Sequence, residues 1–149
     1  MIKSARKKFL GGFTLIELLI VIAILGILAA AVLVAINPAK RTRQARDAQR
    51  KNDIGSLATE VQAYYTAPGQ GLYPSTLTVL TTEGYMKQLP DPPGTATTYT
   101  YLINATTSEA SLYDFLEDPT SGTGLDTRFW CWRSAAGTAV EALTDACAP

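Results

Sequence analysis

The sequence GGFTLIELLIVIAILGILAAAVLVAINP, residues 11–38, decides the fold of this chain. From Leu18 to Ile36 it contains 19 residues without a polar side chain. This length meets the roughly 18 apolar residues expected of a membrane-spanning helix and exceeds the apolar region of a cleaved secretory signal. One carboxylate, Glu17, stands directly before this run. Because a charge in hydrocarbon is costly, Glu17 is a candidate functional residue.

Charge is divided unevenly along the chain, although the formal net charge of the 149 residues is zero. Residues 1–51 carry ten basic and two acidic side chains, whereas residues 52–149 carry three basic and eleven acidic ones. Copies polarised in this way attract one another when a basic part meets an acidic part. Because basic residues flank the apolar run on both sides, their distribution alone leaves the orientation in a membrane open.

The composition excludes several classes of enzyme. The chain contains no histidine, so Ser-His-Asp and Cys-His nucleophiles and histidine-ligated metal sites are ruled out. No Ser-Lys motif supports another nucleophile, and we expect neither an enzyme nor a cofactor. Two cysteines, Cys131 and Cys147, predict a disulfide and an oxidising compartment, with two free buried thiols as the alternative. If the cysteines after the apolar run lie in an oxidising compartment, the basic N-terminal end before that run lies in the cytoplasm.

Helical spacing continues beyond the apolar run. Apolar residues at intervals of three and four predict one stripe on a helix that ends at about Thr66, formed by Ile54, Leu57, Ala58, Val61, Tyr64 and Tyr65. Asn37-Pro38 interrupts the pattern, so either one helix kinks there or two helices meet.

The second half of the chain changes to a period of two. A short helix is expected over 76–82, and alternation then predicts strands at 97–104, 111–116 and 128–133, with a weaker one at 138–143. A long helix followed by a small antiparallel sheet is an α+β fold, and the apolar stripe is the surface on which the sheet packs.

The sequence around Glu17 resembles the N-terminal cleavage and methylation signal of type IV prepilins and of the related pseudopilins of type II secretion. A basic leader ends in glycine, Phe13 follows, and Glu17 comes five residues after Gly12. The resemblance is close over about 9–36 and looser over 43–73. It implies a pilin fold with four parts: a leader at 1–12, an apolar transmembrane and filament-core helix at 13–38, an amphipathic stem helix at 39–66, and a globular head at 67–149 that ends in a disulfide loop.

This resemblance also implies how the chain matures and assembles. A prepilin peptidase would cut after Gly12 and methylate the new amine of Phe13. Copies would then leave the lipid of the cytoplasmic membrane and form a helical filament, outside the cell or in the periplasm, with the help of a platform protein and an ATPase. By the family's arrangement Glu17 pairs with the Phe13 amine of a neighbouring subunit and so selects the axial register. The alternative is a carboxylate that reaches the lipid headgroups.

Further residues carry weaker expectations. Gly26 and Pro38 are candidate points of helix flexibility, although Val34 stands where many pilins carry a proline, and a packing glycine is the alternative. Arg43, Arg46 and Arg50 are expected to meet the acidic heads of neighbouring subunits, with DNA or lipid headgroups as alternatives.

Acidic residues around one loop raise the question of calcium, because pseudopilin heads often bind that ion. Glu117, Asp118 and Asp126 surround this loop, but they lack the spacing of an EF-hand, and solvated acids are the favoured interpretation.

From the resemblance and the residues together, we interpret the chain as a structural subunit of a type IV pilus-like filament. A type II secretion pseudopilin or a DNA-uptake pilin is the alternative within the family. A secreted or membrane-anchored binding domain with an ordinary signal sequence is the alternative outside it.

Overall fold

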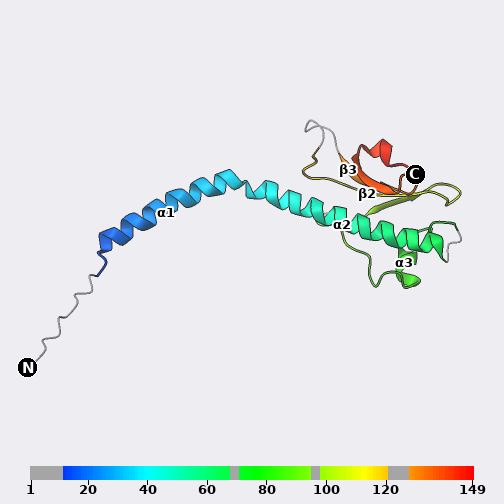
Figure 1. Cartoon of the computed structure of the whole chain (residues 1–149), viewed down its shortest axis with the longest axis horizontal. Coiled ribbons are helices and arrows are strands. Elements are labelled where there is room, and N and C mark those ends of the chain that lie inside the picture. Colours follow the sequence, from blue (N-terminus) through cyan, green and yellow to red (C-terminus); the bar gives the residue numbers. More distant parts are fainter. Residues whose placement is uncertain (1–11, 68–70, 95–97, 121–127) are drawn as a thin grey trace, which may run out of the picture. The chain divides into compact units, whose positions relative to one another are not determined.

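The computed structural model describes residues 12–67, 71–94, 98–120 and 128–149, and the chain divides into two compact units at residue 38 (Figure 1). The first unit contains one long helix, α1 (Leu15–Ile36), whose apolar composition was evident from the sequence. Thr14, in extended conformation, begins this helix, and Asn37 ends it.

Asn37 separates α1 from the next helix, α2 (Pro38–Thr66). Its φ of 47° and ψ of 77° lie in the left-handed region. Proline disfavours helical geometry in the residue before it, and asparagine tolerates left-handed geometry better than most residues. Pro38 itself begins α2, where its missing amide hydrogen costs no helical hydrogen bond. Of the two possibilities left by the sequence, the structure therefore has two helices that meet.

The second unit is an α+β head in which α2 lies beside a four-stranded antiparallel sheet (Figure 1). A short helix α3 (Thr78–Thr82) precedes the sheet. The strands follow in chain order, β1-β2-β3-β4, with bounds Thr100–Ile103, Ala110–Phe115, Phe129–Arg133 and Thr138–Ala142. A short 3-10 helix, η1 (Thr144–Cys147), ends the fold. The predicted α+β, pilin-like fold is thus confirmed.

The core of the head lies between α2 and one face of the sheet. Ile54, Leu57 and Val61 are fully buried, so the apolar stripe of the sequence is the packing face of α2. On the sheet, Leu112 pairs with Trp132 in the antiparallel register, and both contribute to the same core cluster. Because alternate residues of a strand point to opposite faces, Cys131 lies on the other face of β3.

Candidate functional site

The tip of the apolar helix is built by a hydrogen-bonded turn between Thr14 and Glu17. Glu17 Oε2 accepts hydrogen bonds from the backbone amide of Thr14, at 2.9 Å, and from its hydroxyl, at 2.7 Å. The Glu17 amide donates in return to Thr14 Oγ1 at 3.3 Å. This reciprocal arrangement is a capping box, which satisfies amide groups that the first helical turn leaves free. Phe13 precedes it outside the helix and is 87% exposed.

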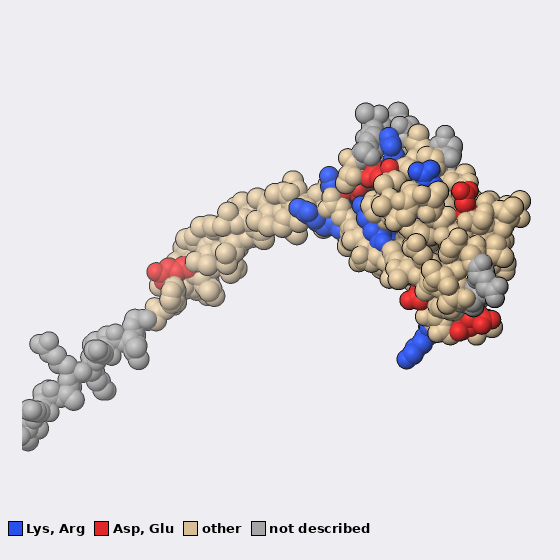
Figure 2. Space-filling view, turned by 45° about the vertical axis from the view of Figure 1, so that its right-hand side comes forward, with Lys and Arg blue, Asp and Glu red and all other residues tan. Residues whose placement is uncertain are grey.

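The whole of α1 presents apolar side chains without internal cover, and none of its residues is buried. Within the described residues it is the one helix long and apolar enough to cross a membrane. Gly26 continues the helix, and a side-chain carbon built there would meet nothing within 4 Å. Any packing role of Gly26 therefore concerns a neighbouring molecule. In Figure 2 this helix is free of charge apart from the acidic residue at its start, and basic side chains begin with α2.

Two arginines of α2 are bound to carboxylates of their own head. Arg46 forms an ion pair with Glu117 through Nε, at 2.8 and 3.0 Å, and through a second, closer contact. Arg50 has no exposed surface. Its guanidinium donates to Asp47 at 2.8 Å, to Asp114 at 3.1 Å and to Glu117 at 2.7 Å.

A backbone carbonyl completes this group, because Arg50 Nη2 also donates to Pro93 O at 2.7 Å. We call Arg46, Asp47, Arg50, Asp114 and Glu117 the Arg50 cluster. For Arg46 and Arg50 the carboxylate partners thus belong to the same chain, whereas carboxylates of a neighbouring subunit were expected from the sequence. The physical reason is that Arg50 lies one turn before Ile54, on the face of α2 that packs against the sheet.

Asp47 extends the Arg50 cluster to the loop after β2. Its two carboxylate oxygens accept the backbone amides of Glu117, at 2.9 Å, and of Asp118, at 2.7 Å. Asp118 in turn accepts a hydrogen bond from Gln44 at 2.7 Å. Glu117 and Asp118, at the start of this loop, are therefore fixed to α2 by their backbone amides as well as by their side chains.

The environment of the cluster changes the pKa values of Glu117 and Asp114 in opposite directions. Hydrogen bonds from Arg46, and then from Arg50, lower the pKa of Glu117 to about 2. Burial raises the pKa of Asp114 above its ordinary value, although Arg50 lies beside it. Burial alone would lower the pKa of Arg50, but its carboxylate partners outweigh that effect and raise it. The arginines therefore stay charged, and Glu117 stays ionised, over the whole physiological range.

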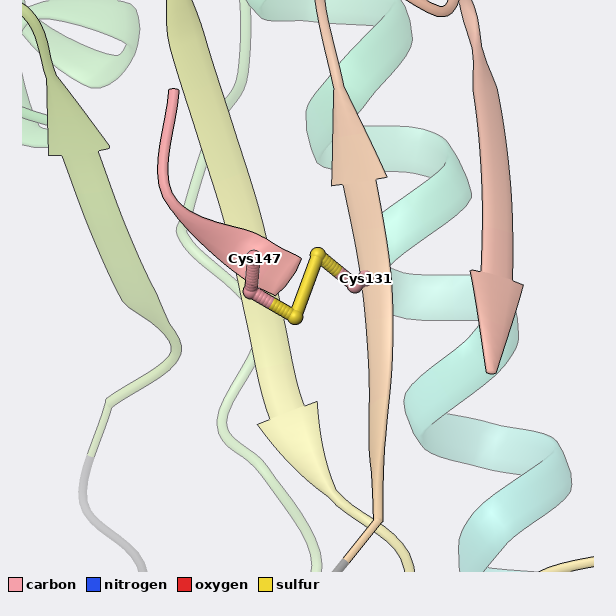
Figure 3. The surroundings of a disulfide bond; sticks show 2 residues. All are labelled: Cys131 and Cys147. Atoms are coloured by element: carbon pink, nitrogen blue, oxygen red, sulfur yellow. A yellow bond between two sulfur atoms is a disulfide. The ribbon is translucent and has the colours of Figure 1, made fainter. Parts of the chain in front are cut away.

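The expected disulfide is present between Cys131 of β3 and Cys147 of η1, with their Cα atoms 5.7 Å apart. Figure 3 shows this bond on the side of β3 that faces away from α2. Both cysteines are buried. The disulfide therefore fixes the C-terminal segment over the second face of the sheet.

Two of the three acids considered for calcium, Glu117 and Asp118, have other contacts. Glu117 and Asp118 are bound within and beside the Arg50 cluster, and Asp126 lies outside the described residues. No group of three or more metal-ligating side chains occurs in the part of the chain that the structure describes.

Two of these features could have been found in the sequence. Thr14-Leu-Ile-Glu17 has the spacing of a capping box, with an acid three residues after a threonine and directly before an apolar run. Asp47 and Arg50 continue the spacing of Ile54 and Leu57 toward the N-terminus of α2. A charged residue at an apolar position of the stripe indicates a buried ion pair, but it does not identify the partners on β2 and in the loop after it.

Comparison with known proteins agrees with the geometry of the N-terminal tip. A family model described as the prokaryotic N-terminal methylation motif matches residues 11–33. The chain is also similar to the type II secretion system core protein G of Pseudomonas aeruginosa, with 36% identity over 128 residues that cover 74% of this chain and 86% of that protein. No solved structure matches the chain significantly. An apolar helix that begins at a capped acid, an α+β head and these two similarities show that the chain belongs to the family of type IV pilins and type II secretion pseudopilins, which are structural subunits.

Proposed function

We propose that this chain is made as a membrane-anchored precursor, cut after Gly12, methylated at Phe13 and polymerised into a helical filament through α1. The observation that carries this proposal is α1 itself: 22 residues, none buried, with one acid in the first turn. A surface of this kind is stable only in lipid or against other copies of the same helix. Gly12 and Phe13 are exposed and lie outside the helix, which is the form of chain that a peptidase can bind.

Within the filament we propose that Glu17 pairs with the Phe13 amine of a neighbouring subunit. Both Thr14 hydrogen bonds go to Oε2, and no described residue is bonded to Oε1, so one oxygen remains for an amine. An unpaired carboxylate in a dry helix bundle costs several kcal/mol. Pairing removes this cost at one axial stagger, which makes Glu17 a selector of register.

Three variants separate this role from the capping role. E17Q keeps an acceptor for the Thr14 amide but removes the charge. T14A removes the hydroxyl that caps the amide of residue 17 but keeps the charge. E17A removes the charge and the side-chain acceptor together, while the Thr14 hydroxyl can still accept the amide of residue 17. If charge pairing fixes the register, E17Q and E17A are processed normally and lower the filament yield more than about tenfold, because several kcal/mol per subunit are lost, while T14A assembles. If T14A fails and E17Q assembles, capping explains Glu17 and the pairing proposal is wrong. Mass spectrometry of the mature N-terminus and electron microscopy of sheared filaments provide the measurements.

The same mass analysis tests the processing step. A mature chain that begins with methylated Phe13 supports the proposal, whereas one that begins beyond Ala30 indicates an ordinary signal sequence and a secreted domain. Processing and assembly would require a prepilin peptidase, a platform protein and an ATPase as partners.

The 36% identity with a type II secretion core protein favours a pseudopilus in the periplasm over a surface pilus as the site of assembly. Deletion of the gene distinguishes them. Loss of protein secretion with surface filaments intact supports the pseudopilus, and loss of surface filaments with secretion intact supports the pilus.

We also propose that α1 loosens between Gly26 and Pro38 on assembly. Amide hydrogen exchange of membrane-bound and filamentous subunits tests this proposal.

A further inference from the structure

The basic residues at the start of α2 divide into two groups. Arg46 and Arg50 are neutralised within the Arg50 cluster. Arg41 and Arg43 form no ion pair with any carboxylate that the structure describes, and the hydrogen bond that Arg41 donates, at 3.2 Å, goes to the neutral amide of Gln44. Arg41 is exposed and Arg43 is half-buried. Two positive charges, two residues apart on α2, are therefore without a counter-charge among the residues that the structure describes.

These arginines lie close to the end of the helix that can cross a membrane. The 22 residues of α1 make a helix about 33 Å long, which matches a hydrocarbon core of about 30 Å. Arg41 and Arg43 follow Ile36 by five and seven residues, most of them in α2, which rises about 1.5 Å per residue. The short stretch of chain between Ile36 and these arginines limits their distance from the end of α1, whatever the angle between the helices. If α1 spans the bilayer, both arginine side chains are therefore within reach of the lipid headgroups.

The local sequence favours an anion at this place. Residues 39–46 contain no acidic side chain, and the first turn of α2 has none. Cations near a helix N-terminus oppose the helix dipole, and a bound anion relieves this repulsion. Guanidinium groups bind phosphate through paired hydrogen bonds, better than a lysine does.

We propose that Arg41 and Arg43, with Lys40 beside them, bind the phosphate groups of anionic phospholipids in the leaflet that faces the head. This inference rests on the proposed anchorage of the precursor by α1. Residues 40–43, which we call the basic collar, hold the start of α2 at the membrane surface until the subunit enters a filament. A basic residue beside an anionic membrane contributes a preference of about fivefold, so the two arginines together contribute roughly 25-fold.

The test uses the full chain in nanodiscs of equimolar phosphatidylglycerol and phosphatidylcholine, with the lipids that stay bound counted by native mass spectrometry. The variants are R41Q/R43Q, the charge-conserving R41K/R43K, and K87Q, which removes one exposed cation elsewhere in the head. The basic residues of the leader are the same in every variant, so differences report on the collar. We expect wild type, R41K/R43K and K87Q to retain phosphatidylglycerol preferentially, and R41Q/R43Q to lose most of that preference.

Equal enrichment of phosphatidylglycerol in wild type and R41Q/R43Q would overturn the inference. If that result comes with weaker cross-linking between subunits in filaments of R41Q/R43Q, the collar binds a neighbouring copy instead. Extraction of the wild-type chain from membranes by alkaline carbonate is a different failure, because it contradicts the membrane anchorage itself. A chain that stays in the membrane without lipid preference contradicts the collar alone.

Discussion

At the scale of single residues, Arg50 connects three separate parts of the head. Its guanidinium bonds to α2 through Asp47, to β2 through Asp114, and to the loop after β2 through Glu117. It also lies 4.4 Å from the centre of the Phe115 ring, a distance at which a cation and an aromatic face attract. A fully buried arginine is tolerated here because every side of it meets an acceptor or a ring.

Replacement of Arg50 by glutamine should destabilise the head strongly. R50Q leaves Asp47 and Asp114 buried without their counter-charge, which costs about 3–5 kcal/mol of the free energy of unfolding. R43Q removes the same charge from a residue that forms no described ion pair, and should cost less than about 0.5 kcal/mol. Urea unfolding of both variants checks the comparison, and a loss below 1 kcal/mol for R50Q would contradict the assigned role.

The Arg50 cluster should also make stability depend on pH. The folded pKa of Glu117, about 2, lies below its unfolded value, so its contribution is complete above about pH 5 and is lost as the pH falls toward 2. The raised pKa of Asp114 acts in the opposite direction and offsets part of this loss. Allowing for partial exposure of Glu117, we expect the wild type to lose on the order of 1–2 kcal/mol more than E117Q across this interval. Thermal unfolding of both proteins at pH 5 and pH 3 measures the difference. An equal loss of stability between these pH values in wild type and E117Q would refute it.

At the scale of elements, the periodicity of the sequence was sufficient to predict the two long helices and the four strands, but not the 3-10 helix η1. The spacing of Ile54, Leu57 and Val61 predicted the buried face of α2, and the alternating segments became β1 to β4 with ends shifted by a few residues at most. The partners of Arg50 could not be predicted, because Asp114 and Glu117 are more than 60 residues away and only the register of the sheet brings them to α2. Local spacing carries information about one element, whereas an ion pair between elements depends on the complete fold.

The disulfide between β3 and η1 should be needed for full stability of the head. It closes a loop across a sequence separation of 16, which restricts the unfolded chain by about 3 kcal/mol. C131S/C147S should therefore lower the melting temperature by more than about 10 °C. Reductant should lower the melting temperature of the wild type to a similar value and leave the variant unchanged. A wild type that is insensitive to reductant would show that the bond contributes little.

At the scale of the whole molecule, the two units differ in what they require from their surroundings. The head has its own core of helix and sheet residues, whereas α1 has no buried residue. We expect residues 39–149 alone to fold and to remain monomeric in water, with a cooperative thermal transition. The full chain should need detergent, lipid or assembly into filaments. Analytical ultracentrifugation of both forms tests this, and aggregation of residues 39–149 would mean that the head depends on α1.

The place of the C-terminus has a practical consequence. Cys147 is held to β3 on the sheet face away from α2, and exposed Ala148 and then Pro149 follow it. A fluorophore or affinity tag added after Pro149 would therefore start from a covalently anchored point and would not pull on the stem helix. Live-cell imaging of a chain labelled at this end could follow its export and incorporation.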